Sequence, residues 1–287
     1  MTLIETIHNA ATQLSAAGIS NARLDAEVLL AMLAQKDRAW LISHMHDALD
    51  DTLRETYEAV VQRRAGREPL QYIVGNQEFY GLDFFVTPDV LIPRPETELA
   101  VELALKIIGN HAQQSTIVDL CTGSGCIAVT LARLAPTVNV VAIDKSSKAL
   151  KIAERNAAQH QVADRIRLLE GDLLQPLERL DIRNKVDMIV SNPPYIPSAD
   201  YTTLQPEVRD FEPEMALIAG PQGTELHQRI IETAPAYLKR HGALIMEMGM
   251  GQAELLLEMI RTSDAFIAPS VYKDLAGIER VLIARKA

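Results

Sequence analysis

From Thr116 to the end of the chain, short apolar segments alternate with segments of helical spacing. The apolar segments are rich in isoleucine, valine and leucine. They predict strands at residues 117–120, 138–143, 166–169, 188–190, 243–246 and 280–283. Helices are expected between them, for example over residues 127–134 and 147–160. This alternation is typical of a mostly parallel sheet covered by helices on both faces, so the sequence predicts an α/β fold.

The first 75 residues carry a different pattern, in which apolar residues recur at helical spacing and no strand signal is evident. Leu3, Ile7 and Leu14 share one helical face, and Gly18 ends that segment. We therefore expect a small helical domain over residues 1–75.

A short segment joins the two patterns. Residues 78–86 are aromatic and β-branched around Gly81, which predicts a β-hairpin. Pro95, followed by acidic residues, indicates the start of a helix. A chain of 287 residues is long enough for two domains. The predicted organisation is a helical domain (1–75), a hairpin linker (76–94) and a second domain (95–287).

A glycine-rich loop follows the first strand predicted in the second domain. It reads Asp119-Leu120-Cys121-Thr122-Gly123-Ser124-Gly125, and glycines let the backbone turn tightly and approach a ligand. The next predicted strand ends at Asp144, about twenty residues later, where a carboxylate can bind the hydroxyls of a ribose. Asp172 follows the third strand, where it could contact an adenine. Together these features indicate a bound nucleoside, NAD included. The alternatives are purely structural roles: Asp119 as a polar residue at a strand end, Asp172 as a turn residue, and the cysteines as small buried side chains.

The strand predicted at residues 186–191 leads directly into Asn192-Pro193-Pro194-Tyr195. Because ligands of open α/β sheets bind beyond the carboxyl ends of the strands, this tetrapeptide and the glycine loop share one edge. The prolines stiffen the turn, and the Asn192 side-chain oxygen and the Pro193 carbonyl can accept both hydrogens of a planar NH2 group. This aligns a weakly nucleophilic nitrogen with a methyl-bearing sulfonium, and Tyr195 offers a face to the planar group. The pattern predicts methylation of an amide or amine nitrogen; a proline-rich turn without function is the alternative.

Charge and cysteine content bear on the remaining classes of function. The net charge is -10, whereas proteins that bind nucleic acid usually carry an excess of Lys and Arg. Cys121 and Cys126 form neither a disulfide framework nor a zinc pattern, and His44 and His46 would diverge on a helix. We expect no metal site, no signal peptide and no membrane span, and therefore a soluble cytoplasmic protein.

The chain resembles the release-factor glutamine methyltransferases, the family called HemK or PrmC. The resemblance covers essentially the whole chain and is most specific at residues 91–98, joined to a helical N-terminal domain. The other matching segments are the glycine loop, the tetrapeptide and residues 69–75, 78–81, 211–213 and 274–280. It implies a Rossmann-like class I S-adenosylmethionine methyltransferase sheet of seven strands. It also implies methyl transfer to the glutamine amide in the Gly-Gly-Gln motif of class 1 peptide chain release factors, with the helical domain helping to grip the factor.

The tetrapeptide, the loop and the resemblance together give the expected site. Catalytic roles fall to Asn192, Pro193 and Tyr195, and the substrate glutamine would be held by Asn192, Pro193, Pro194 and Tyr195. The residues expected to bind S-adenosylmethionine are Asp119, Cys121, Thr122, Gly123, Ser124, Gly125, Asp144, Asp172, Leu173 and Asn192. The resemblance places Arg94 and Thr97 at the cofactor roof, with a plain helix start as the alternative. This chain has Leu173 where an aromatic is common and Cys121 where a glycine is usual.

Other functions use some of the same features. An adenine-amino methyltransferase acting on DNA or RNA would share the tetrapeptide, but it predicts a basic groove and a recognition insert. A non-catalytic cofactor-binding scaffold would not need Asn192, and an NAD oxidoreductase would need hydride-transfer residues that we cannot identify. The expected partners are therefore class 1 release factors, without direct contact to nucleic acid.

Overall fold

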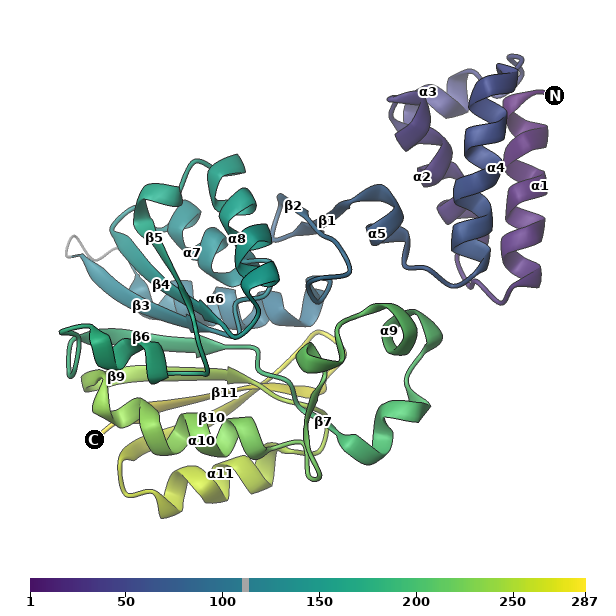
Figure 1. Ribbon diagram of the computed structural model, residues 1–287. Helices are drawn as coiled ribbons and strands as arrows, with labels where there is room; N and C mark the ends of the chain where they lie inside the picture. The colour runs from purple at the N-terminus through teal and green to yellow at the C-terminus, as the bar shows by residue number, and fades with distance from the viewer. Residues whose placement is uncertain (110–113) are drawn as a thin grey trace. The chain divides into compact units, whose positions relative to one another are not determined.

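The computed structural model describes residues 1–109 and 114–287 (Figure 1). These residues form two compact units. The first comprises Met1–Asn76 together with Gln205–Phe211, and the second comprises Gln77–Leu204 together with Glu212–Ala287. Among the described residues, no helix combines the length and apolar character needed to cross a membrane.

The first unit is helical. Its helices are α1 (Leu3–Ala16), α2 (Ala22–Ala34), α3 (Arg38–Ser43), α4 (Asp51–Ala65), α5 (Leu70–Val74) and α9 (Pro206–Phe211). Thr2 and Glu5 form a capping box at the start of α1, and the Asp50 carboxylate caps α4, which satisfies backbone N–H groups that no helix turn can pair. Leu14 and Tyr57 are fully buried in its core, and the Tyr57 hydroxyl donates to the Ala26 carbonyl over 2.9 Å.

An ion-pair cluster explains why α9 belongs to this unit. Glu207 of α9 accepts from Arg64 over 3.2 Å and from Arg67 over 2.5 Å. Arg64 also donates to Asp25 over 2.7 Å, and both of these side chains are about nine-tenths buried. The sequence prediction kept residues 95–287 together, because nothing near Glu207 in the chain announces its distant arginines. The structure groups residues 205–211 with the helices instead.

The second unit is built on a seven-stranded sheet with the order β10-β11-β9-β6-β3-β4-β5. The strands are β3 (Ser115–Leu120), β4 (Val138–Asp144), β5 (Ile166–Glu170), β6 (Val186–Ser191), β9 (Leu238–Glu247), β10 (Phe266–Lys273) and β11 (Glu279–Lys286). β3, β4, β5, β6 and β9 run parallel, whereas β11 is antiparallel to β9 and β10. The predicted α/β class and the seven-stranded sheet are confirmed.

One sheet strand escaped the sequence prediction. β10 contains Pro269, and its pairing with β11 is irregular between Ile267 and Ser270. Proline cannot donate to a strand ladder and is confined to edges and bulges, so the segment lacks an ordinary strand pattern. β10 is therefore an irregular strand at the edge of the sheet, where it pairs with the antiparallel β11.

Helices cover both faces of the sheet, as the strand alternation requires. α6 (Glu98–Ile108), α7 (Cys126–Leu134) and α8 (Ser147–Gln159) lie on one face, and α10 (Glu225–Thr233) and α11 (Ala253–Thr262) lie on the other (Figure 1). Ile117 packs with the first group and its neighbour Val118 with the second, because successive strand side chains point to opposite faces.

Smaller elements complete this unit. β1 (Asn76–Phe79) and β2 (Leu82–Phe85) form the predicted hairpin around Tyr80 and Gly81, whose φ angles are 53° and 75°. β7 (Ile196–Pro197) pairs with β8 (Ile218–Gly220). The short 3-10 helices are η1 (Pro95–Thr97), η2 (Ala163–Arg165), η3 (Gln175–Arg179), η4 (Ser198–Thr203), η5 (Glu214–Ala216) and η6 (Ala234–Ala236).

The order of the parallel strands positions the site. From β3 the chain adds β4 and β5 on one side and β6 and β9 on the other, so the order reverses between β3 and β6. Leu120 and Ser191, the last residues of these two strands, are paired in register. Ligands of open α/β sheets bind at such a switch point, because the loops after the two strands diverge there and leave a crevice.

Candidate active site

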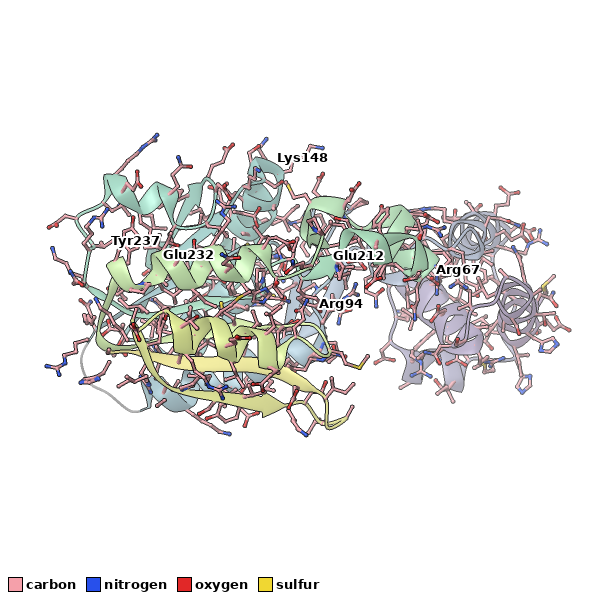
Figure 2. The ribbon with its side chains drawn as sticks, turned by 90° about the horizontal axis from the view of Figure 1, so that it is seen from below. Arg67, Arg94, Lys148, Glu212, Glu232 and Tyr237 are labelled. Atoms are coloured by element: carbon pink, nitrogen blue, oxygen red, sulfur yellow. The ribbon has the colours of Figure 1, made fainter. Side chains whose placement is uncertain are left out.

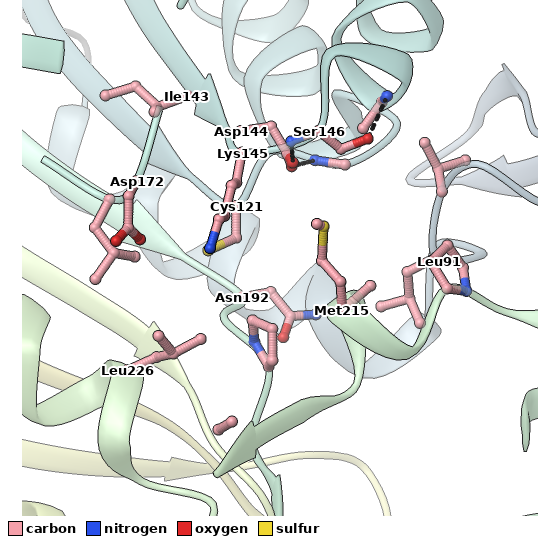
Figure 3. A pocket seen from close by; sticks show the side chains of 18 of the residues that line it. Leu91, Cys121, Ile143, Asp144, Lys145, Ser146, Asp172, Asn192, Met215 and Leu226 are labelled. Carbon is pink, nitrogen blue, oxygen red and sulfur yellow. Dashed lines mark hydrogen bonds between the residues drawn. The ribbon is translucent and has the colours of Figure 1, made fainter. Parts of the chain in front are cut away.

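A cavity of about 320 Å³ lies at this switch point (Figure 3). It is lined by both predicted loops, through Cys121 and Gly123 after β3 and through Asn192 and Pro194 after β6. Cavities of this size hold small organic ligands. Figure 3 shows Asn192 between an end that carries Asp172 and Leu226 and an opposite side that carries Leu91 and Met215.

Positive backbone angles shape the loop after β3. Cys121 has φ 59° and Gly123 has φ 54°, and both line the cavity. This left-handed region favours glycine, so Cys121 stands where its side chain is accommodated at some cost. Gly125 has φ 81°, and a Cβ there would lie 3.2 Å from the Ala153 Cα, so glycine permits close packing of the loop on α8.

Asp119 supports the loop from behind. Its Oδ2 accepts from the Thr122 hydroxyl over 2.6 Å and from the Ala128 backbone N–H over 3.2 Å. The residue is fully buried, and this burial raises the pKa of Asp119 to about 7. Of the predicted cofactor residues, Asp119, Thr122, Ser124 and Gly125 are not among the described residues that line the cavity.

Asp144, the last residue of β4, lines the cavity with a fixed carboxylate. One oxygen accepts from the Gly123 N–H and the other from the Ser146 N–H, each over 2.8 Å. Each oxygen keeps a further lone pair, so the group can still accept two hydroxyl hydrogens. Burial raises the pKa of Asp144, while backbone hydrogen bonds from Ser146, Gly123 and Lys145 lower it.

The far end of the cavity is apolar apart from one ion pair. Ile143, Leu173 and Leu226 contribute to its wall. Asp172 also lines it, and its carboxylate accepts from Arg229 of α10 over 2.7 Å. The sequence prediction placed Asp172 near an adenine but missed Arg229, because no local pattern connects α10 with the end of β5.

In the tetrapeptide, Asn192 is oriented by a distant hydroxyl. Its Nδ2 donates to the Thr97 Oγ1 over 3.0 Å, so its Oδ1 remains as an acceptor. Within residues 1–109 and 114–287, no donor bonds to this oxygen or to the Pro193 carbonyl. Asn192 and Pro194 line the cavity, whereas Pro193 and Tyr195 are not in its described lining. The arrangement offers two unpaired acceptors on one rigid turn.

Thr97 and Arg94 were expected at the cofactor roof. The structure places Thr97 behind Asn192, buried to 2 % exposure. Arg94 pairs with Glu212, which also accepts from the Ile92 N–H; Figure 2 labels Arg94 and Glu212. The described wall on that side comes from residues 89–91 and Met215.

Tyr195 is held by groups that the sequence prediction did not include. Its carbonyl accepts from the Gln252 Nε2 over 2.8 Å, and a Cβ on Gly223 would lie only 2.5 Å from that carbonyl oxygen. Its hydroxyl lies 3.5 Å from the Glu247 Oε1, and burial raises the pKa of Tyr195. Gln252 and Glu247 flank the loop after β9, which ends at the same edge of the sheet. That shared edge was the available signal for them.

The chain is similar to known proteins over nearly its whole length. Family models described as the PrmC N-terminal domain and the methyltransferase small domain match residues 5–75 and 95–205. A release factor glutamine methyltransferase of Geobacter sulfurreducens is 45% identical over 93% of this chain and 91% of its own length. One of Koribacter versatilis is 40% identical over 100% and 99%. A methyltransferase structure from Pyrococcus furiosus, 17% identical, matches with a TM-score of 0.52 over 80% of this chain and 99% of that one, which shows the fold alone.

Proposed function

This chain belongs to the family of release factor glutamine methyltransferases, and on that premise we propose that it methylates the side-chain amide nitrogen of a glutamine in a peptide chain release factor. The glutamine is that of the Gly-Gly-Gln motif in class 1 factors. The proposal rests on one observation. The Asn192 NH2 group donates to Thr97, which leaves the Asn192 oxygen and the Pro193 carbonyl as two acceptors on the same turn.

S-adenosylmethionine fits the cavity as methyl donor. Asp144 keeps acceptor capacity for two ribose hydroxyls, and the apolar wall at Ile143 and Leu173 suits an adenine ring. The protein backbone at Cys121 and Gly123 would pass close to the ligand. Asp119, Thr122, Ser124 and Gly125 would maintain the conformation of the loop. When bound, S-adenosylmethionine supplies an electrophilic methyl group.

The two acceptors perform the essential work on the substrate. An amide nitrogen is a poor nucleophile, because its lone pair is delocalised into the carbonyl. Two hydrogen bonds from the NH2 group to Asn192 and Pro193 fix its plane and direct the nitrogen toward the donor. Both acceptors are partially negative, so they favour the positive charge that develops on nitrogen in the transition state. Tyr195 adds an aromatic face beside the cationic nitrogen.

The surroundings of the reaction also form part of the proposal. The helical unit takes part in gripping the release factor, and the reaction supports translation termination in the cytoplasm. Two observations support this setting: the net charge of -10, which disfavours bare nucleic acid, and the free thiols of Cys121 and Cys126.

A labelling experiment tests this function. Purified protein would be incubated with labelled S-adenosylmethionine and a class 1 release factor, its Gln→Ala variant at the Gly-Gly-Gln motif, or DNA. We expect label on the intact factor alone. Label on DNA, or equal label on the Gln→Ala factor, would overturn the proposal.

A further inference from the structure

A buried glutamate lies directly behind the tetrapeptide. Glu247 is the last residue of β9, the neighbour of β6, and its exposure is 1 %. Its Oε1 is 3.5 Å from the Tyr195 hydroxyl. Its Oε2 is buried without a hydrogen-bond partner among the described residues. A buried, incompletely paired carboxylate is costly to keep, so fold stability does not account for it.

The charged and polar groups around Glu247 come from several elements. Arg280 of β11 favours its ionised form and Glu96 of η1 opposes it. Arg280 is itself paired with Asp274 over 3.1 Å, so its charge is shared. From α10, the buried His227 faces only the Glu247 main chain, where its Nε2 contacts the carbonyl over 2.7 Å. Glu247 therefore has no dedicated cationic partner within the described chain.

Thr97 connects Glu247 with Asn192. The Thr97 oxygen accepts from the Asn192 NH2 group over 3.0 Å, so its single hydrogen points to another acceptor. Glu247 interacts with Thr97, and this interaction lowers the Glu247 pKa. The carboxylate thus contacts the Tyr195 hydroxyl directly and interacts with Thr97, which holds the Asn192 side chain.

The proposed reaction gives this placement a use. As the methyl carbon bonds to the amide nitrogen, its bond to sulfur breaks, the sulfonium becomes a neutral thioether, and the nitrogen carries a positive charge until it releases one proton to water. A nearby anion of low solvent exposure stabilises such a charge far better than it would in water. We propose that ionised Glu247 is a positioning residue for this reaction, which sets Asn192 and Tyr195 and places a negative charge behind the nitrogen that becomes cationic. This inference rests on the proposed function.

The inference predicts a pH dependence. Burial is the largest influence on Glu247 and raises its pKa to about 7. The ionised form is the active one, so kcat should rise as the pH increases through about 7. Thr97→Val removes a hydrogen bond that lowers this pKa, so the rise should move to higher pH.

The main test is Glu247→Gln, which keeps the size and an acceptor oxygen but removes the charge. At pH 8 we expect kcat to fall about tenfold or more, as for other supporting groups around a reactive centre. KM for the release factor should stay within about twofold, because its amide nitrogen is uncharged until the methyl group is transferred. The rise of kcat near pH 7 should disappear.

Asp187→Asn is the matched control. Asp187 lies near the start of β6, at the end of the strands away from the site, beside Lys239. It should retain the wild-type pH profile. A Glu247→Gln enzyme with wild-type kcat and an unchanged profile would overturn the inference, and so would losses that follow only a lower melting temperature. If Glu247→Gln does not fold, Thr97→Val provides the test. A pH dependence of kcat identical to that of the wild type in Thr97→Val would contradict the interaction between Thr97 and Glu247. Failure of the wild-type enzyme to label the release factor would instead contradict the proposed function.

Discussion

The glycine loop after β3 and the tetrapeptide after β6 lie at one sheet edge but are supported from different distances along the chain. The loop is held by its own first residue and by the strand and helix that follow it: Asp119 accepts from Thr122 and Ala128, Gly123 donates to Asp144, and Gly125 packs on α8. The tetrapeptide is held from afar, by Thr97, Gln252 and Glu247. The supports of the loop come from the adjoining strand and helix, whereas the turn that aligns a reacting nitrogen is held by residues 50 or more positions away. We therefore expect the loop to determine cofactor affinity and the tetrapeptide to determine the rate of the chemical step.

The largest effect is expected for Asn192→Ala. Removal of one of the two acceptors should lower kcat about 10²–10³-fold, because the amide loses alignment and transition-state stabilisation. Kd for S-adenosylmethionine should change little, which calorimetry would measure beside steady-state kinetics. A variant with near-normal kcat would mean that the tetrapeptide does not perform the alignment.

Gly223→Ala tests the distant support of the tetrapeptide. The new Cβ would lie 2.5 Å from the Tyr195 carbonyl oxygen at a φ of +80°, so the turn must shift. We expect kcat to fall about 10- to 100-fold, since small displacements of aligning groups are costly. Gly277→Ala is the control, because it has the same kind of backbone angle, φ +79°, but no atom within 4 Å. Equal losses in both variants would point to backbone strain alone.

Asp144→Asn addresses the cofactor side of the comparison. Loss of a charged acceptor for ribose hydroxyls should weaken S-adenosylmethionine binding about tenfold, equivalent to roughly 1.4 kcal/mol. At saturating cofactor, kcat should remain within about twofold of wild type. If kcat fell while Kd stayed constant, the division of labour between the two regions would be wrong.

The smallest effect concerns the internal support of the glycine loop. Thr122→Val removes one hydrogen bond to the buried Asp119, and we expect a loss of about 1–3 kcal/mol in the free energy of unfolding by urea denaturation. Thr130→Val is the matched control. The buried Thr130 hydroxyl has no hydrogen-bond partner in the described structure, so its removal should leave the free energy of unfolding nearly unchanged. Similar losses in both would show that the Asp119 contact is unimportant.

The sequence predicted what is encoded locally. The strand and helix alternation, the glycine loop and Asn192 to Tyr195 are short patterns with a physical meaning, and they were sufficient for the fold class and the main chemistry. Thr97, Arg229, Gln252 and Glu247 owe their positions to strand order and helix packing. Nothing in their immediate neighbours announces a partner 50 or more residues away, so only the folded chain reveals them. β10 was missed for a local reason, the proline at its bulge.

Glu207 has a consequence for how this protein could be divided or inherited. The helical unit is completed by residues 205–211, which the chain supplies only after it has built the tetrapeptide. A gene cut at codon 76 would give a helical fragment whose Arg64 and Arg67 lack their shared carboxylate, and a remainder that keeps the carboxylate without the arginines. The N-terminal region is therefore not an exchangeable module. A homologue with a different N-terminal region would also need a different sequence at residues 205–211.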